Sequence, residues 1–291
     1  MLADNGLNCV ADVHAVLGEG PVWVARESSL YWLDIKGLKI FRLDERGAMT
    51  EWPTPMRVGS IVPRKKGGFI AGTEHGIAEI DLDTGKFEIV ADPEAALPDN
   101  RFNDGKVDRQ GRFWAGTMDD REQQASGTLY RVDPDLSVHN LDTSYKVTNG
   151  PAFSPDGRIA YHSDSALQVT YRSAVASDGG LGPRETFLQF NPGDGFPDGM
   201  TVDSEGCLWI AFCDGWCVRR YSPSGEWLET LKLPVSRPTS CAFGGRDLDR
   251  LYISSASIDL DEQALAMQPN AGGLFMCVPG VQGIAEIPFA G

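Results

Sequence analysis

The stretch GPVWVARESSLYWLD at residues 20–34 begins with glycine and continues as alternating apolar residues, a polar turn and a second apolar segment. The same order returns in GPAFSPDGRIAYHSD at residues 150–164 and in GMTVDSEGCLWIAF at residues 199–212. Apolar residues at every second position, bounded by Gly, Asp or Pro turns, are typical of a β-hairpin. These stretches therefore predict a hairpin that is repeated along the chain.

Three further copies are shorter or more degenerate. They read GSIVPRKKGGFIAG at residues 59–72, GKVDRQGRFWAG at residues 105–116 and SCAFGGRDLDRLYIS at residues 240–254. Successive copies start 39 to 49 residues apart, and most continue into a third strand. Repeats of roughly 40–50 residues with three or four strands are the blades of a β-propeller. Six copies therefore predict an all-β, six-bladed β-propeller.

A propeller must close its ring, because an open sheet edge promotes aggregation. The alternating segment VADVHAVL at residues 10–17 precedes the first copy, and we expect it to be the outer strand of the last blade. The other strands of that blade are expected at residues 251–254, 273–278 and 283–289. We therefore predict a single propeller domain over residues 1–291. A pair of β-sandwiches is the structural alternative, but it gives no reason for a sixfold repeat.

Composition excludes several classes of function. The chain has 291 residues and a formal net charge of −15, which argues against a nucleic-acid-binding protein. Its 33 glycines and 18 prolines favour many turns over long helices. No segment approaches the roughly 18 apolar residues of a membrane helix, and the N-terminal residues lack the features of a signal peptide. We expect a cytoplasmic monomer that binds neither nucleic acid nor membrane.

The six cysteines form no C-x-x-C pair, and most of them lie far apart in the sequence. This spacing favours reduced thiols in a cytosolic protein. Cys213 and Cys217 flank the short turn DGW, so a disulfide across that hairpin is the alternative.

Candidate ligands for a metal ion come from the residue directly before each copy of the repeat. The first strand of each blade lines the central channel of a propeller, so equivalent positions meet at one mouth of that channel. These residues are Glu19, Val58, Asp104, Asn149, Asp198 and Thr239. Four of them carry oxygen donors, and neighbouring carboxylates repel one another unless a cation binds them. The set predicts one divalent cation, with Fe2+, Mn2+, Zn2+, Ca2+ and Mg2+ all compatible with oxygen ligands.

Each of these residues taken singly fits an ordinary turn or a solvated loop. The shared phase of four oxygen donors in a cyclic repeat favours a common site. The polar stretch RFNDGK at residues 101–106 is either plain surface or a rim of the same mouth, where Arg101, Asn103 and Lys106 would face the hydroxyls of a sugar-like ligand. Other catalytic motifs are absent: the chain has no G-x-S-x-G, no P-loop and no histidine pair at metal-binding spacing.

Four motifs resemble the regucalcin/gluconolactonase family of six-bladed propellers. They are LGEGPVW at residues 17–23, RFNDGK at 101–106, NGPAFSPDG at 149–157 and PDGM at 197–200. The likeness extends from about residue 10 to the end of the chain. It implies a metal-dependent hydrolase that opens sugar-acid lactones.

The same resemblance implies roles for individual residues. It assigns the metal ligands to Glu19, Asn149 and Asp198, and the sugar contacts to Arg101 and Asn103. The family does not count the residue at Asp104 among the ligands. Asp104 and Lys106 are therefore expected beside the ligand set, where they would support it.

The chain departs from the family pattern after GTM at residues 116–118. Relatives place there an acidic residue that contacts the substrate, but by direct alignment this chain has Arg121. Asp120 lies one position away and is the expected substitute for that acid. A likeness to bacterial sugar-oxidation lactonases suggests D-xylonolactone as the first substrate to consider. A gluconolactonase is the alternative.

The implied mechanism is attack of water on the lactone carbonyl, with the cation as Lewis acid and Asp198 as general base. The residues leave open whether Asp198 or the water of the cation acts as the base. A calcium-binding regulatory protein without turnover is the main rival, although the chain lacks the Asp-rich loop of calcium sensors. A scaffold propeller is a further alternative, but it needs no ring of acidic residues.

Overall fold

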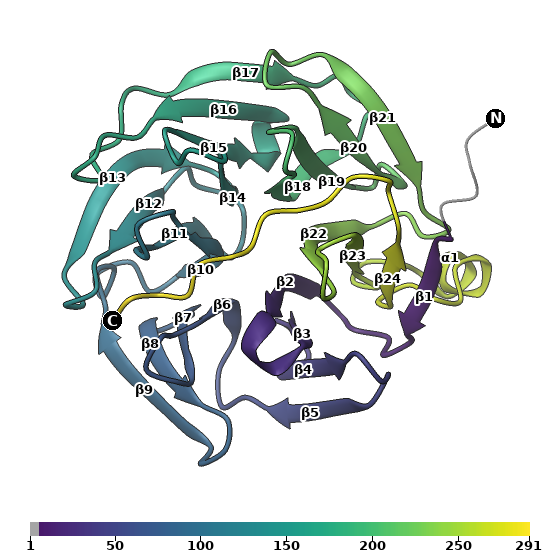
Figure 1. Cartoon of the computed structure of the whole chain (residues 1–291), viewed down its shortest axis with the longest axis horizontal. Coiled ribbons are helices and arrows are strands. Elements are labelled where there is room, and N and C mark those ends of the chain that lie inside the picture. The colour runs from purple at the N-terminus through teal and green to yellow at the C-terminus, as the bar shows by residue number, and fades with distance from the viewer. Residues whose placement is uncertain (1–5) are drawn as a thin grey trace. The chain divides into compact units, whose positions relative to one another are not determined.

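Six four-stranded sheets, all antiparallel between neighbouring strands, make up nearly all of the regular structure in the computed structural model, which describes residues 6–291 (Figure 1). Each sheet is one blade, so the predicted all-β, six-bladed propeller is confirmed. The prediction about a targeting sequence concerns the N-terminal residues, of which residues 1–5 lie outside the described part of the chain.

In the first five blades the strands follow one another along the chain. The first blade consists of β2 (Gly18–Val24), β3 (Ser29–Asp34), β4 (Lys39–Asp44) and β5 (Met49–Pro53). The second consists of β6 (Val58–Pro63), β7 (Phe69–Thr73), β8 (Gly76–Asp81) and β9 (Lys86–Ala91). The third consists of β10 (Asn100–Val107), β11 (Phe113–Asp119), β12 (Gly127–Val132) and β13 (Val138–Tyr145). The fourth and fifth are β14 (Thr148–Phe153), β15 (Ile159–Asp164), β16 (Val169–Ala174) and β17 (Glu185–Gln189), then β18 (Phe196–Val202), β19 (Leu208–Cys213), β20 (Cys217–Tyr221) and β21 (Trp227–Lys232).

The sixth blade joins the two ends of the chain. Its order is β22 (Pro238–Gly244), β23 (Arg250–Ser255), β24 (Leu274–Cys277) and β1 (Asn8–Ala11). The pairing of β1 with β24 is the predicted closure of the ring by the N-terminal strand. The short helices are η1 (Ala25–Glu27), η2 (Ser165–Leu167) and α1 (Glu262–Met267).

Two details of the sixth blade were predicted wrongly. The N-terminal strand ends at Ala11 and does not extend to residue 17, because the chain turns at His14, which has a φ of 49°. Residues 283–289 contribute no strand to this blade. Gly283 instead forms a bridge to Asp203, and Phe289 forms a bridge to Arg64. Such single bridges depend on partners far away in the sequence. A local alternation of apolar and polar residues therefore does not predict them.

The chain divides into two compact units of three blades each. Unit 1 contains Met1–Pro53 and Asn191–Ala285, with the first, fifth and sixth blades. Unit 2 contains Thr54–Phe190 and Glu286–Gly291, with the second, third and fourth blades. The single domain over residues 1–291 stays a prediction.

The tryptophans that recur with the blades are core residues in both units. Trp209 of unit 1 and Trp114 of unit 2 are fully buried, and each indole N–H donates to a buried aspartate at the end of a first strand. Trp209 donates to Asp203 at 2.9 Å, and Trp114 donates to Asp108 at 2.8 Å. A buried carboxylate is costly unless it is hydrogen-bonded, so these matched pairs stabilise the blade turns as well as the core.

A β-bulge interrupts the first strand of every blade at the same phase. The register shifts lie between Glu19 and Val22, Val58 and Ser60, Phe102 and Gly105, Asn149 and Ala152, Pro197 and Met200, and Pro238 and Ser240. The residue before each copy of the repeat is thus at or inside a bulge, and bulges re-aim side chains beside functional sites. Gly20 and Gly150 follow two of these residues with φ of 54° and 81°, a conformation that glycine adopts without strain.

Candidate active site

The candidate residues of unit 2 meet where β10 and β14 begin. The Asn103 side chain donates through Nδ2 to Oδ1 of Asn149 at 3.1 Å and to the carbonyl oxygen of Thr148 at 2.8 Å. Asn149 in turn donates through Nδ2 to Oγ of Ser165 at 2.8 Å. Both asparagines are buried, so their amide groups are held in one orientation. The predicted sugar contact Asn103 is therefore bonded directly to the predicted cation ligand Asn149.

Arg101 extends this group of hydrogen bonds. Its Nη1 donates to Oδ1 of Asn103 at 2.7 Å and to the carbonyl oxygen of Phe102 at 3.1 Å. Its Nε donates to Oδ1 of Asp120 at 2.7 Å. Only 6% of Arg101 is exposed. The hydrogen bonds of its guanidinium group to other described residues come from Nε and Nη1, and Nη2 is the remaining nitrogen.

Asp120 and Arg121 point to different partners. The Asp120 carboxylate is bonded to Arg101, as stated, and to Nη1 of Arg57 at 2.6 Å. Arg121 has a side chain that is 65% exposed and forms an ion pair with Asp99 at 2.8 Å. Of these two residues, Asp120 is thus the one beside the predicted sugar contacts.

Asp104 supports the backbone behind Asn149. It lies in the bulge of β10, where its Oδ1 accepts from the N–H of Gly105 at 2.7 Å, and its Oδ2 accepts from the N–H of Gly150 at 2.9 Å. Burial raises the pKa of Asp104 to about 6, against the lowering effect of the Lys106 charge and of these two hydrogen bonds. Lys106 also lies 4.0 Å from the carboxylate of Glu286. Asp104 is bonded to the residue that follows a predicted ligand.

Two aspartates that we did not single out from the sequence anchor the segments that lead to the candidate ligands. In unit 2, Asp164 at the end of β15 accepts from the N–H groups of Lys146 and Val147 at 2.8 and 3.3 Å. In unit 1, Asp34 at the end of β3 accepts from the N–H groups of residues 16 and 17 at 2.9 and 3.0 Å. Both aspartates end matching copies of the repeat, at residues 34 and 164, and that shared phase was the signal available in the sequence.

Unit 1 contains two buried candidate carboxylates, Glu19 and Asp198. Oε2 of Glu19 accepts from the N–H of Gly20 at 3.1 Å in the bulge of β2. Burial raises the pKa of the Cys213 thiol well above its usual value, and the negative charges of Asp198, Asp214 and Glu19 raise it further, while Arg237 lowers it. The carboxylates of Glu19 and Asp198 therefore act on the same thiol and concentrate negative charge there.

The donor set fits a hard divalent cation. The three predicted ligands, Glu19, Asp198 and Asn149, offer two buried carboxylates in unit 1 and a buried amide oxygen in unit 2. Oxygen donors of this kind bind Ca2+, Mg2+ and Mn2+, and carboxylates also bind Fe2+ and Zn2+. Within residues 6–291 there is no group of three or more His, Cys, Asp or Glu side chains arranged to hold a metal. The predicted set contains only two such side chains, Glu19 and Asp198, and its third ligand is Asn149.

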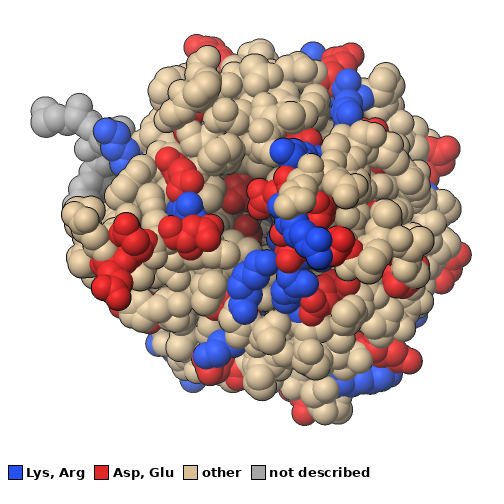
Figure 2. All heavy atoms as spheres, turned by 180° about the vertical axis from the view of Figure 1, so that it is seen from behind, with Lys and Arg blue, Asp and Glu red and all other residues tan. Residues whose placement is uncertain are grey.

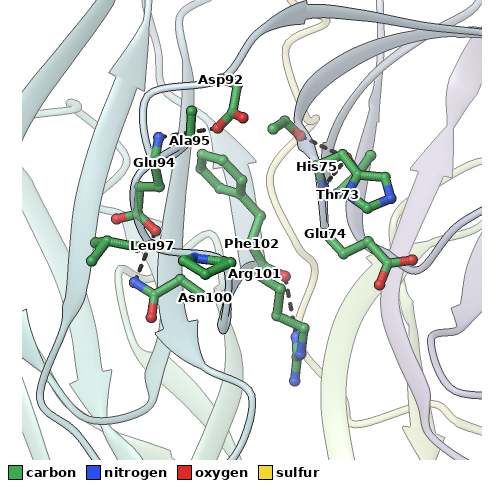
Figure 3. A pocket seen from close by; sticks show the side chains of 12 residues that line it. Thr73, Glu74, His75, Asp92, Glu94, Ala95, Leu97, Asn100, Arg101 and Phe102 are labelled. Carbon is green, nitrogen blue, oxygen red and sulfur yellow. Dashed lines mark hydrogen bonds between the residues drawn. The ribbon is translucent and has the colours of Figure 1, made fainter.

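A cavity of about 280 Å³ opens beside Arg101 in unit 2 (Figure 3). Phe102 and Leu97 contribute apolar surface, and Figure 3 shows Glu74 and His75 on one side of the cavity and Glu94 on the other. Asp92 adds a third carboxylate to the lining. The cavity therefore favours a neutral, hydroxyl-rich ligand over an anion.

His162 has a structural role. His162 is buried between Tyr145 and Ser173, with hydrogen bonds of 3.1 and 3.3 Å, and burial lowers its pKa to about 4. All six cysteines are free thiols, including Cys213 and Cys217. No helix among residues 6–291 is long and apolar enough to span a membrane. On the face shown in Figure 2, basic side chains lie next to acidic ones.

Residues 17–257 match the sequence model of the SMP-30/Gluconolactonase/LRE-like region. The chain belongs to this family. The resemblance inferred from four motifs is thereby confirmed.

Relatives of this SMP-30/gluconolactonase family member match over nearly the whole chain. It is 42% identical to the 6-deoxy-6-sulfogluconolactonase of Pseudomonas putida, with 98% of this chain and 99% of that protein covered. It is 40% identical to the regucalcin of Danio rerio, with 98% of both chains covered. The solved structure of a calcium-binding protein, regucalcin, from Agrobacterium tumefaciens matches with a TM-score of 0.92 at 28% identity, covering 97% of this chain and 96% of that one.

Proposed function

We propose that this SMP-30/gluconolactonase family member is a lactonase that hydrolyses a sugar-acid lactone to the aldonic acid. One observation carries the proposal: Arg101, Asn103 and Asn149 form a continuous buried chain of hydrogen bonds. A ligand bound at Arg101 is thereby coupled to a residue expected to bind the cation. The similarity to a sulfogluconolactonase over nearly the full length supports the same reaction class.

The proposal includes one divalent cation held by Glu19, Asn149 and Asp198. Their common position at the bulge of a first strand supports this set, as does the chemistry of their oxygen donors. The similarity to regucalcins, one of which is described as calcium-binding, supports a divalent metal. When bound, the cation supplies a Lewis acid for the lactone carbonyl.

The protein groups then have separate tasks. Asp198 takes the proton of the attacking water as general base. Arg101 donates from Nη2 to the sugar, and Asn103 and Asp120 orient its hydroxyl groups. Asp120 is half of an ion pair with Arg101, so a hydroxyl placed between them finds both a donor and an acceptor. These contacts position the ring without taking part in bond breaking.

A neutral aldonolactone fits the charges near Arg101 better than a sulfonated one. Glu74, Asp92 and Glu94 line the adjacent cavity, and Asp120 already neutralises Arg101. An anionic substituent in this cavity would meet Asp92 and Glu94 and be repelled, whereas Glu74 is paired with Arg57. Both D-xylonolactone and D-gluconolactone are neutral, and the likeness to bacterial sugar-oxidation lactonases makes D-xylonolactone the first substrate to test, with D-gluconolactone and 6-deoxy-6-sulfo-D-gluconolactone as comparisons.

A lactone panel tests this function. Release of acid from each lactone is measured with the metal-loaded protein and again after chelation, with each rate corrected for spontaneous ring opening. We expect D-xylonolactone or D-gluconolactone to be hydrolysed, and chelation to abolish the rate until a divalent cation is returned. No turnover of any lactone with metal present would instead favour a calcium-binding protein without catalysis. A rate that survives chelation would contradict the role of the cation.

A further inference from the structure

Arg57 connects Asp120 to the rim of the cavity. It directly precedes β6 in unit 2, and its side chain lies between two carboxylates. Nη1 donates to Oδ2 of Asp120 at 2.6 Å, and Nε donates to Oε2 of Glu74 at 2.7 Å. Its backbone N–H also donates to Oε1 of Glu74 at 2.7 Å, while the N–H of Glu74 donates to the carbonyl oxygen of Arg57 at 3.1 Å. Glu74 thus holds Arg57 from both its backbone and its side chain.

The two oxygens of Asp120 are shared between two guanidinium groups. Oδ1 accepts from Arg101 at 2.7 Å, and Oδ2 accepts from Arg57 at 2.6 Å. Asp120 is only partly buried and follows the end of β11, so its own strand does not hold the side chain in place. A carboxylate that bridges two arginines has its plane and its rotamer determined. The orientation of Asp120 therefore depends on Arg57.

The four charged groups also balance one another. Glu74 and Asp120 are acidic, Arg57 and Arg101 are basic, and they alternate along the chain of ion pairs. Burial lowers the pKa of the Arg57 guanidinium, but the hydrogen bonds and charges of Asp120 and Glu74 outweigh it and leave that pKa above its usual value. Removal of Arg57 would leave Asp120 and Glu74 with one cation for two carboxylates. Asp120 would then keep one guanidinium contact in place of two, and its orientation toward Arg101 would no longer be fixed.

We propose that Arg57, held by Glu74, is a positioning residue that sets the orientation of Asp120 and Arg101 and so determines how the hydroxyl groups of the lactone are bound. This inference rests on the proposed function for its substrate. Arg57 itself need not touch the sugar. Its effect should therefore pass through Asp120 and appear in substrate binding more than in the chemical step.

A double-mutant cycle on lactone hydrolysis tests this coupling. We expect Arg57→Met to raise KM by roughly 10-fold with a smaller change in kcat, because a misoriented Asp120 weakens contacts to bound substrate and transition state alike. Adding Arg57→Met to Asp120→Asn should cost little beyond Asp120→Asn alone. Arg57→Lys should recover part of the loss, since it restores the charge but not the two-sided contact. Additive losses, or an unchanged KM in Arg57→Met, would overturn the proposal.

A second measurement is independent of catalysis. Hydrogen exchange of the Arg101 Nε–H, followed by NMR in the protein alone, reports its bond to Asp120 directly. We expect Arg57→Met to reduce the protection of this N–H and the control Arg172→Met to leave it unchanged. Arg172 is an exposed arginine of the same unit that pairs with Glu185. Unaltered protection in Arg57→Met would reject the inference whether or not the wild type proves to be a lactonase. Failure of wild-type turnover would reject the proposed function alone.

Discussion

The side-chain amide of Asn103 donates a hydrogen bond to Oδ1 of Asn149, with the two atoms 3.1 Å apart. This bond joins the bulge of β10 to the bulge of β14 and links a residue expected to bind sugar to a residue expected to bind a cation. Because Asn149 Oδ1 has two lone pairs, it accepts from Asn103 and still has a lone pair for a metal. The two expected roles would therefore share one oxygen atom.

Glu19→Gln, Asn149→Ala and Asp198→Asn should each abolish or severely weaken lactone hydrolysis while the fold survives. All three residues lie at the bulge of a first strand and none belongs to an apolar cluster, so their loss opens no hole in the hydrophobic core. Turnover and bound metal are measured on each variant, with circular dichroism as the control for folding. Wild-type turnover and metal content in any one of them would remove that residue from the ligand set.

Arg101→Ala should raise KM or lower kcat without loss of metal. Its contacts are to Asp120, Asn103 and the carbonyl oxygen of Phe102, and none of them is a predicted ligand. Kinetics and metal content measured on the same preparation decide the point. If the metal is lost together with Arg101, the residue belongs to the ligand shell and our assignment is wrong.

Asp104→Asn should weaken metal retention and lower turnover without eliminating it. A group that orients ligands typically changes metal affinity by about 10- to 100-fold, and Asp104 acts on the backbone beside Asn149. Asparagine retains one of the two acceptor oxygens, so one of the two N–H contacts is lost. Activity is titrated against added Fe2+ or Mn2+ for the variant and the wild type. Recovery at high metal is the expected result, and complete inactivity of a folded protein would make Asp104 a direct ligand or the base.

Asp120→Asn should raise KM for a hydroxylated lactone, whereas Arg121→Met should leave the kinetics close to wild type. Asp120 is bonded to Arg101 and Arg57, but Arg121 lies on the surface with Asp99. The loss of one charged contact to a substrate is worth roughly 2 kcal/mol, or about 30-fold in kcat/KM. Steady-state kinetics of both variants give the comparison. The reverse pattern would assign the substrate contact to the residue that direct alignment selects.

His162 should make the free energy of unfolding fall as the pH decreases from about 6.5 to about 4. Burial lowers its pKa to about 4, so the unfolded chain takes up a proton in this range before the folded protein does. At about 1.4 kcal/mol per pKa unit, the total is about 3 kcal/mol. The raised pKa of Asp104 acts in the opposite direction over nearly the same range, since its folded form binds the proton more tightly.

Because these two effects oppose each other, the measurement compares how steeply the free energy of unfolding changes with pH in the wild type and in two variants. Urea unfolding of the metal-free protein is followed from pH 4 to pH 7 for the wild type, for His162→Gln and for His139→Gln. His139 is an exposed histidine of the same unit and serves as the control. Between pH 6.5 and pH 4 the change in the free energy of unfolding should be about 3 kcal/mol less unfavourable in His162→Gln than in the wild type, and His139→Gln should match the wild type. Equal slopes in all three proteins would show that His162 is not the group that titrates.

The candidate ligands were predicted from their places in the repeat. A shared phase selected Glu19, Asp104, Asn149 and Asp198 as candidates, and the resemblance to the family left Asp104 out of the ligands. The structure gives that phase a local cause in the bulge at the start of each blade. Asp34 and Asp164 end two matching copies of the repeat, and this regularity was not used to predict their role in anchoring the backbone. The closing strands were less predictable, because a bridge such as Gly283 to Asp203 depends on two segments with no pattern in common.

The sequence by itself determined the blades of this protein, since alternation and turns act between neighbouring residues and pair each strand with the next. Only the tertiary structure shows that Asp120, and not Arg121, lies beside Arg101. Asp120 is bonded to Arg101, 19 residues away, and to Arg57, 63 residues away, and no spacing or periodicity connects the three. Their contact exists because β6, β10 and β11 belong to neighbouring blades that pack against each other, which brings their ends together and leaves Arg121 facing solvent.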